Sequence, residues 1–237
     1  MEDQRPYLLL IHGFMEDSRI WEPQLANWSK KYRILAPDLP GFGRRVQEDF
    51  LGIEEEAIAL WQWIDSMNIH QISIAGHSMG GYIGLAMAEQ QHQRIAEFWL
   101  INSHACADGV MKQQNRTRLI ELVKEKGTTL FLDGFHQNLF AQSNRERFES
   151  VTSILKERAK SIRPETVIQA SLSMRDRPDR TSILSQLGER ALFFVGTEDE
   201  SIEPWQIDET SKCLPPTHIF VMQGVGHMAM YEYDGKS

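Results

Sequence analysis

Cysteine is scarce in this sequence: only Cys106 and Cys213 occur among 237 residues. The two lie far apart and in no metal-binding or redox spacing, which excludes a disulfide-stapled scaffold and leaves room for at most one disulfide. Other metal-ligand spacings, such as H-x-x-E-H, are also missing. No G-x-G-x-x-G follows a predicted strand, so we predict a protein with no metal and no nucleotide or other cofactor.

Positive charge is also in short supply, with 25 Lys and Arg against 33 Asp and Glu and a formal net charge of −8. Without a basic run, the chain offers little to a nucleic acid or an anionic membrane, and we expect neither as a partner. No apolar stretch approaches the length that crosses a bilayer, and residues 1–6 lack the features of a signal peptide. We therefore expect a cytoplasmic protein.

Short apolar runs alternate with amphipathic stretches over most of the chain. Such runs suit strands that are buried on both faces of a parallel sheet. The expected strands are residues 7–11, 32–36, 71–75, 97–102, 191–195 and 218–222, and the expected helices between them include 21–30, 53–67, 82–88, 181–187 and 204–213. The alternation predicts an α/β fold: a mostly parallel sheet of about six strands with helices on both faces.

The alternation stops between residues 104 and 180, where no strand is expected. Four amphipathic stretches, 117–126, 130–140, 145–162 and 164–174, predict short helices there. We therefore predict an all-helical cap, residues 104–180, inserted into a core formed by residues 1–103 and 181–237.

A glycine-rich turn, Gly76–Gly81, joins a predicted strand to a predicted helix. Ser78 at its centre needs a strained backbone, which requires residues with almost no side chain two places before and after it. Gly76 and Gly80 occupy those places. The turn exposes the Ser78 hydroxyl and presents the Met79 amide to a bound molecule, so it predicts a nucleophile elbow.

A serine nucleophile needs a histidine base, which in turn needs a carboxylate to orient it. In parallel sheets such groups follow the carboxyl ends of strands. Asp199 comes just after the expected strand 191–195, and His227 follows the last expected strand. We predict that Ser78, Asp199 and His227 form a catalytic triad.

These segments together resemble the α/β-hydrolase superfamily over nearly the whole chain. The matching segments are residues 76–81, 12–14, 38–43, 196–199 and 226–227. The resemblance implies that the backbone amides of Phe14 and Met79 form the oxyanion hole. The predicted cap is similar to that of the carboxylesterase and enol-lactonase branch.

Three features depart from that family. The usual two strands before residue 7 are missing, so we expect six strands and not eight. Only ten residues follow His227, too few for a full closing helix. Arg44 and Arg45 stand where relatives commonly have a small hydroxyl residue.

Apolar side chains of the predicted cap suit a pocket, because ligand pockets are mostly apolar. The residues expected to line it are Phe131, Phe135, Phe140 and, just after the base, Met228. The other histidines are expected in supporting places: His12 holding its loop, His77 pointing away from the pocket, and His104 and His136 at surface or capping positions. Arg175, Arg177 and Arg180 are interpreted as a solvated charged turn and only secondarily as carboxylate ligands. The alternatives to Asp199 are its sequence neighbours Glu198 and Glu200 and the more distant Asp176 and Asp179.

We interpret the chain as a cofactor-free serine hydrolase that cleaves a small, largely apolar carboxylic ester or lactone through an acyl-enzyme on Ser78. The same fold and triad also serve C–C bond hydrolysis, elimination in the menaquinone pathway, and perhydrolysis. An epoxide or haloalkane hydrolase is disfavoured, because those relatives have aspartate at the position of Ser78. The alternative of another class is a ligand-binding receptor without turnover.

Overall fold

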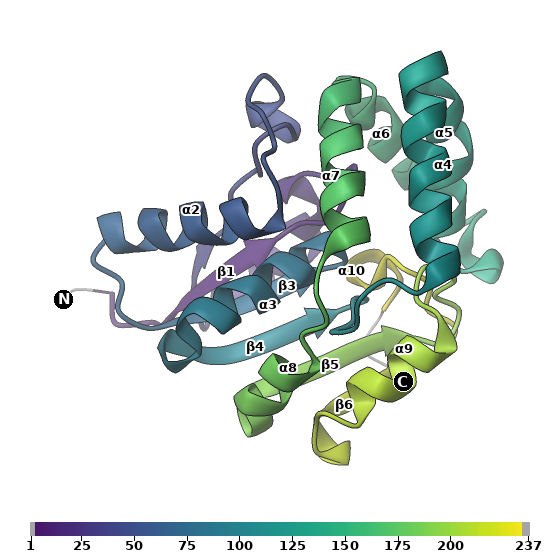
Figure 1. The fold of residues 1–237 in the computed structure, drawn as a ribbon. Coiled ribbons are helices and arrows are strands. Elements are labelled where there is room, and N and C mark those ends of the chain that lie inside the picture. Colours follow the sequence, from purple (N-terminus) through teal and green to yellow (C-terminus); the bar gives the residue numbers. More distant parts are fainter. Residues whose placement is uncertain (1–2, 234–237) are drawn as a thin grey trace.

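One sheet of six parallel strands forms the centre of the computed structural model, which describes residues 3–233 (Figure 1). The strands are β1 (Tyr7–Ile11), β2 (Arg33–Leu35), β3 (Ile72–His77), β4 (Ile95–Ile101), β5 (Ala191–Gly196) and β6 (Ile219–Met222). Their order, β2-β1-β3-β4-β5-β6, confirms the predicted number and direction of the strands. The chain reverses its direction of travel across the sheet at β1, which pairs with both β2 and β3. Ligands of open parallel sheets bind at such a switch point.

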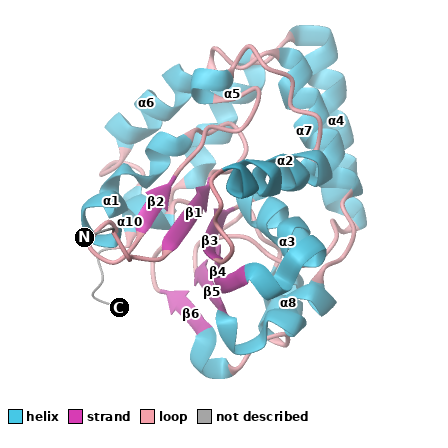
Figure 2. Ribbon diagram, turned by 90° about the vertical axis from the view of Figure 1, so that its left-hand side faces the viewer, coloured by secondary structure: helices cyan, strands magenta, loops and turns pink. Residues whose placement is uncertain are grey.

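Helices cover both faces of the sheet, as expected. Figure 2 shows α1 (Glu22–Trp28) and α10 (Ala229–Glu232) on one face and α2 (Ile53–Ser66), α3 (Met79–Gln91) and α8 (Thr181–Leu187) on the other. Helix α9 (Pro204–Ser211) follows β5. Alternate residues of β1 enter the two resulting cores: Leu8 and Leu10 contact the side of α10, and Leu9 and Ile11 contact the side of α2 and α3.

The strand-free segment consists of helices that lie together beyond one end of the sheet (Figure 1). They are α4 (Val110–Lys126), α5 (Thr129–Phe135), α6 (Glu149–Ala159) and α7 (Pro164–Asp176). Helix α4 begins seven residues before the predicted stretch 117–126, and α5 ends at Phe135, where a 3-10 turn (His136–Leu139) takes over. The division of the chain into a core and a separate cap stays a prediction.

Two arginines of the turn after α7 are buried, so the interpretation of this turn as solvated was wrong. The side chain of Arg177 pairs with Asp108 at 2.7 Å and is 2% exposed. Arg180 is 3% exposed and pairs with Glu54 and Glu89 at 2.6 and 2.9 Å. Buried guanidinium groups are tolerated because carboxylates from distant segments neutralise them.

Glu56 is buried in α2, and burial raises its pKa to about 7. The unfolded side chain loses its proton near 4.5, so the stability of the fold falls as the pH rises between these two values. We expect Glu56→Gln, which stays neutral, to be more stable than the wild type at pH 8 by about 1–3 kcal/mol, with a smaller difference at pH 5. Urea denaturation at both pH values measures this, with the exposed Glu55→Gln as the control. A difference that does not depend on pH would contradict it.

Candidate functional site

Ser78 lies at a strained turn between β3 and α3, with a φ of 51° and a ψ of −119°. The glycines on either side of it are required because a side chain at either position would collide with the backbone. A Cβ on Gly76 would lie 2.5 Å from the carbonyl oxygen of Gly80, and one on Gly80 would lie 2.1 Å from that of Ile11. The close approach of α3 to β1 and β3 therefore depends on these glycines, and it places Ser78 at the switch point of the sheet.

Asp199 and His227 meet at the same edge of the sheet, after β5 and β6. The Nδ1–H of His227 donates to both carboxylate oxygens of Asp199, at 3.0 and 2.9 Å. Both residues are buried. The side-chain amide of Asn102 donates to Asp199 Oδ2 and to the carbonyl oxygen of Gly226, both at 2.9 Å. Asn102 thus ties the carboxylate to the loop that carries the histidine.

Hydrogen bonds keep Asp199 ionised despite its burial. Burial alone would raise the pKa of its carboxyl, but the charge and hydrogen bond of His227, with donors on Asn102 and the Ser201 amide, hold that pKa below its ordinary value. A carboxylate at Nδ1 fixes the proton of the neutral imidazole there. The lone pair is then on Nε2, the form that a general base requires.

Ser78 and His227 line one small cavity, with a volume of about 90 Å³. Phe14, Tyr82 and Phe135 are among the other residues of its wall. A larger apolar cavity, about 320 Å³, lies against the face of the sheet that α1 and α10 cover, and its wall includes no serine, histidine or carboxylate. Of these two cavities, the smaller one therefore has both a hydroxyl that could act as a nucleophile, on Ser78, and a ring that could act as a base, on His227.

The backbone amides of Met79 and Phe14 were expected to form an oxyanion hole, and both residues lie close to Ser78 in the fold. Met79 is the first residue of α3, and the first amides of a helix have no acceptor within the helix. The same end of α3 carries the positive pole of the helix dipole. Phe14, in the loop after β1, is part of the cavity wall beside Ser78. A negative oxygen formed next to Ser78 is thus stabilised by the start of α3.

A buried ion pair that no motif in the sequence indicates connects the loops around the cavity. Glu16 Oε2 accepts hydrogen bonds from the Gly13 amide at 2.8 Å and from His77 Nδ1 at 2.9 Å. The other ring nitrogen of His77 donates to the carbonyl oxygen of His227 at 2.9 Å. Because both ring nitrogens face oxygen acceptors, His77 is an imidazolium. It links the loop of Phe14 to the loop of His227.

The electrostatics of this pair agree with that assignment. Burial alone would lower the pKa of His77, but the charge and hydrogen bond of Glu16 and the His227 carbonyl raise it above its ordinary value. Burial would raise the pKa of Glu16, and His77 lowers it. The stability that His77 contributes is therefore complete below pH 6.5 and is lost as the pH rises through its higher pKa in the folded protein.

We expect Glu16→Gln to reduce the free energy of unfolding by about 3–5 kcal/mol at pH 5.5, because it leaves the buried His77 without a counter-ion. The loss becomes smaller at pH 8. At that pH the histidine is neutral in the unfolded chain, as it is in the folded variant, so folding of the variant no longer requires loss of a proton. Urea denaturation at the two pH values tests this, with the exposed Glu22→Gln of α1 as the control. An equal loss at both pH values would show that His77 is not charged in the fold.

The structure places the four expected pocket residues differently. Phe135 is part of the cavity wall, and Phe131 packs against both Phe14 and Phe135 at 6.0 and 4.8 Å between ring centroids. Phe131, Phe140 and Met228 are not part of that wall, so of the four expected residues Phe135 alone is placed there. Phe140 and Met228 are 1% and 0% exposed and belong to the core on the α1 and α10 face.

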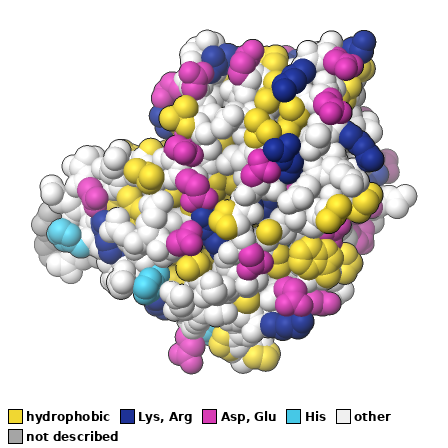
Figure 3. Space-filling model, viewed as in Figure 1, with side chains coloured by type: hydrophobic (Ala, Val, Ile, Leu, Met, Phe, Trp, Pro, Cys, Tyr) yellow, Lys and Arg dark blue, Asp and Glu magenta, His cyan; other side chains and the backbone are white. Residues whose placement is uncertain are grey.

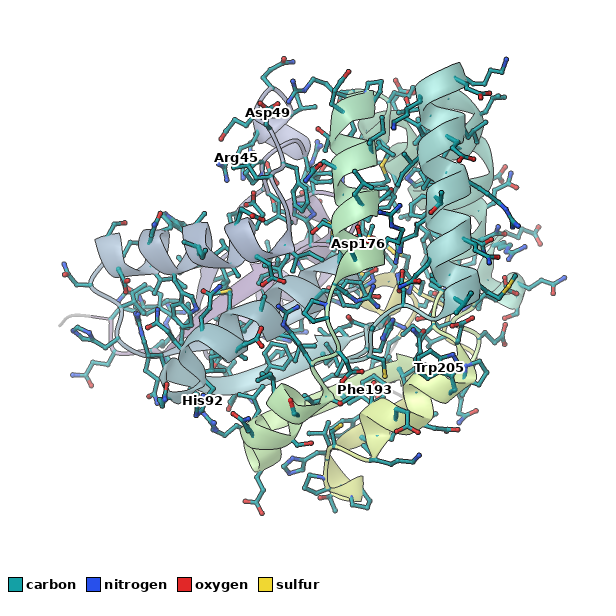
Figure 4. All side chains as sticks on the ribbon, viewed as in Figure 1. Arg45, Asp49, His92, Asp176, Phe193 and Trp205 are labelled. Carbon is teal, nitrogen blue, oxygen red and sulfur yellow. The ribbon has the colours of Figure 1, made fainter. Side chains whose placement is uncertain are left out.

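The more distant acids considered as alternatives to Asp199, and the arginines near them in the sequence, lie away from the cavity that Ser78 and His227 line. Asp176, at the end of α7, is exposed and pairs with Arg175 at 2.7 Å (Figure 4). Asp179 accepts hydrogen bonds from Thr181 at the start of α8. Arg45, also labelled in Figure 4, pairs with Glu48 at 2.6 Å. None of these residues contributes to the cavity wall.

Three further histidines are buried. His12 Nε2 accepts a hydrogen bond from the Leu39 amide at 3.0 Å, so it holds the loop as expected. His104 contacts the Tyr82 hydroxyl and Arg177, and burial together with Arg177 lowers its pKa well below the ordinary value. Neither His104 nor His136 lies at the surface, since each is 1% exposed. His136 is the C-cap residue of α5, and its Nδ1 contacts the carbonyl oxygen of Leu132 at 3.3 Å, so its expected capping position is confirmed, whereas that of His104 was wrong.

Residues 3–233 include no group of three His, Cys, Asp or Glu side chains that could hold a metal ion. Both cysteines are free thiols. In the same part of the chain, no helix combines the length and the apolar character needed to cross a bilayer. Acidic and basic side chains are interspersed on the face in Figure 3.

Comparison with known proteins identifies the family of the chain. Residues 6–234 match a family described as "alpha/beta hydrolase fold". Lipase 1 of Psychrobacter immobilis is 24% identical, over 95% of this chain and 72% of the lipase. The chain spans 21–59% of the length of three further curated relatives.

Similar solved structures include two hydrolases. A thermophilic esterase from Thermogutta terrifontis, with malate bound, has a TM-score of 0.84 and 28% identity, over 94% of this chain and 83% of the esterase. The enol-lactonase from Burkholderia xenovorans LB400 also has a TM-score of 0.84, with 21% identity, over 97% of this chain and 86% of that one.

Proposed function

This chain belongs to the alpha/beta hydrolase fold family, and on that basis we propose that it is a serine hydrolase that cleaves a small carboxylic ester or lactone without a cofactor. One observation carries the proposal: the His227 ring, oriented by Asp199, lines the same small cavity as Ser78 at its strained turn. The esterase, lipase and enol-lactonase among the similar proteins favour ester chemistry over other uses of the fold.

The proposed reaction has two halves. His227 Nε2 takes the proton of the Ser78 hydroxyl as its oxygen attacks the ester carbonyl. The amides of Met79 and Phe14 stabilise the negative oxygen of the tetrahedral intermediate. The intermediate collapses as His227 returns the proton to the leaving alcohol, which leaves an acyl group on Ser78.

Water completes the cycle. His227 removes a proton from a water molecule that attacks the acyl-enzyme, and the same ring then protonates Ser78 as the acid leaves. Asp199 remains ionised and stabilises the imidazolium that forms in each half. The cavity, at about 90 Å³, is below the range of about 300–1,000 Å³ common for ligand pockets, which supports a small acyl group.

A series of p-nitrophenyl esters of increasing acyl length tests this proposal. We expect turnover with the shortest esters and a decline in kcat/KM as the chain lengthens beyond the cavity. Proteolysed or heat-denatured protein is the control for spontaneous hydrolysis. A folded protein that hydrolyses no ester or lactone, at any acyl length, would contradict the proposal and favour a binding protein.

A further inference from the structure

Two basic side chains of α4 belong to the wall of the catalytic cavity. Lys112 and Arg116 are four residues apart, so they lie on one face of the helix, and both line the cavity with Ser78 and His227. Figure 1 shows that the chain enters α4 at the end nearest the sheet, so its first turns are the ones beside the strand ends. An apolar ester would need neither charge.

The carboxylates around these cations are already in use. Asp108 pairs with Arg116 through one oxygen and with Arg177, at 2.7 Å, through the other. One carboxylate therefore serves two guanidinium groups. The acids nearer Ser78 have cationic or histidine partners of their own: Glu16 pairs with His77, and Asp199 with His227.

Lys112 is the cation left without a carboxylate. Within residues 3–233 it makes no ion pair, and its Nζ donates to the carbonyl oxygen of Ser201 at 2.9 Å. Burial, followed by the charge of Arg116, lowers its pKa, while Asp108, Asp199 and Glu203 attract it from a distance. A partly buried ammonium group is destabilising unless an anion lies near it. It has three N–H donors, and the bond to Ser201 uses one of them, so Lys112 can donate further hydrogen bonds at the cavity.

We infer that the physiological substrate is an ester or lactone that carries a free carboxylate, which Lys112 and Arg116 bind while the ester carbonyl lies at Ser78. This inference rests on the proposed function and narrows its substrate class. A carboxylate fits because it accepts hydrogen bonds from both an ammonium and a guanidinium group. It replaces the expectation of a largely apolar substrate by one that is apolar along its length and charged at one end.

Matched pairs of esters test the inference. With the charge on the acyl side, monomethyl glutarate is compared with methyl pentanoate; with the charge on the alcohol side, acetylglycolate is compared with propyl acetate. The measured quantity is the ratio of kcat/KM for the anionic ester to that for its neutral partner. We expect at least one pair to give a ratio above 10, and that pair shows which side of the ester carries the carboxylate.

Substitution of Lys112 identifies the source of the preference. We expect Lys112→Met to lower the ratio about 10- to 100-fold, chiefly through KM, since hydrogen bonds between charged groups contribute this much. Lys112→Arg keeps the charge and restores most of the ratio. The matched control is Lys124→Met, an exposed lysine in the last turn of the same helix.

The outcomes separate this inference from the proposed function. Ratios at or below 1 in both pairs, or a ratio that Lys112→Met does not change, would overturn the inference while ester hydrolysis itself stands. Failure of all four esters, together with the p-nitrophenyl series, would instead remove the proposed function. Circular dichroism of each variant shows whether it is folded.

Discussion

Ser78→Ala lowers kcat for the preferred p-nitrophenyl ester by about 10⁴- to 10⁶-fold. The substitution removes the nucleophile, and only the oxyanion site and substrate binding remain to accelerate the attack of water. The strained backbone at this position does not depend on the hydroxyl, and alanine is no larger than serine, so the fold is retained. Release of p-nitrophenol under saturating ester measures the effect.

The control for this experiment is Ser66→Ala, at the exposed end of α2, where the hydroxyl caps the Trp63 carbonyl. We expect wild-type turnover from this variant. A Ser78→Ala protein that retained more than about one hundredth of the wild-type kcat would show that another residue or a bound water performs the attack.

Asp199→Asn has the second largest expected effect, a decrease in kcat of about 10⁴-fold, as found for the same change in a serine protease triad. An amide at this position presents an NH₂ group to His227 or to Asn102, both of which are donors in the present arrangement. Either the ring adopts the wrong tautomer or a buried donor is left unpaired. The pre-steady-state rate of acylation, measured by stopped flow, separates this loss from any change in KM.

Asp208→Asn, an exposed acid of α9, is the matched control and keeps the wild-type rate. If Asp199→Asn stayed within 10-fold of the wild type, Asp199 would not be the residue that orients the base.

The fold follows from the sequence where apolar periodicity is strong. Strand β1 has the bounds expected from its continuous apolar run, and α8 those expected between Thr181 and Leu187. The start of α4 was missed because Lys112 to Arg116 are polar residues that face the cavity or solvent and give no apolar stripe. Periodicity reports only the residues that pack on a core.

Burial of charge could not be predicted in the same way. Arg177 and Arg180 look like surface residues in a charged turn, but their partners Asp108, Glu54 and Glu89 lie 69 to 126 residues away in the chain. Sequence patterns relate residues that are close together in the chain, so they do not reveal pairs this far apart.

The same distinction applies to the candidate site: local features of the sequence could be predicted, and contacts between distant loops could not. Ser78 was predicted from its glycine-rich turn, and Asp199 and His227 from the rule that functional groups follow the ends of parallel strands. The same rule would have found Asn102, which directly follows β4 and supports Asp199. Glu16 and His77 were not paired in advance, since their contact joins loops 61 residues apart.

Labelling with a fluorophosphonate shows whether Ser78 is the nucleophile. We expect one phosphonyl group per chain, on the peptide that contains Ser78, with labelling and loss of esterase activity at the same rate and no label on Ser78→Ala. Modification of a different residue, or inactivation that leaves Ser78 unmodified, would mean that Ser78 is not the nucleophile.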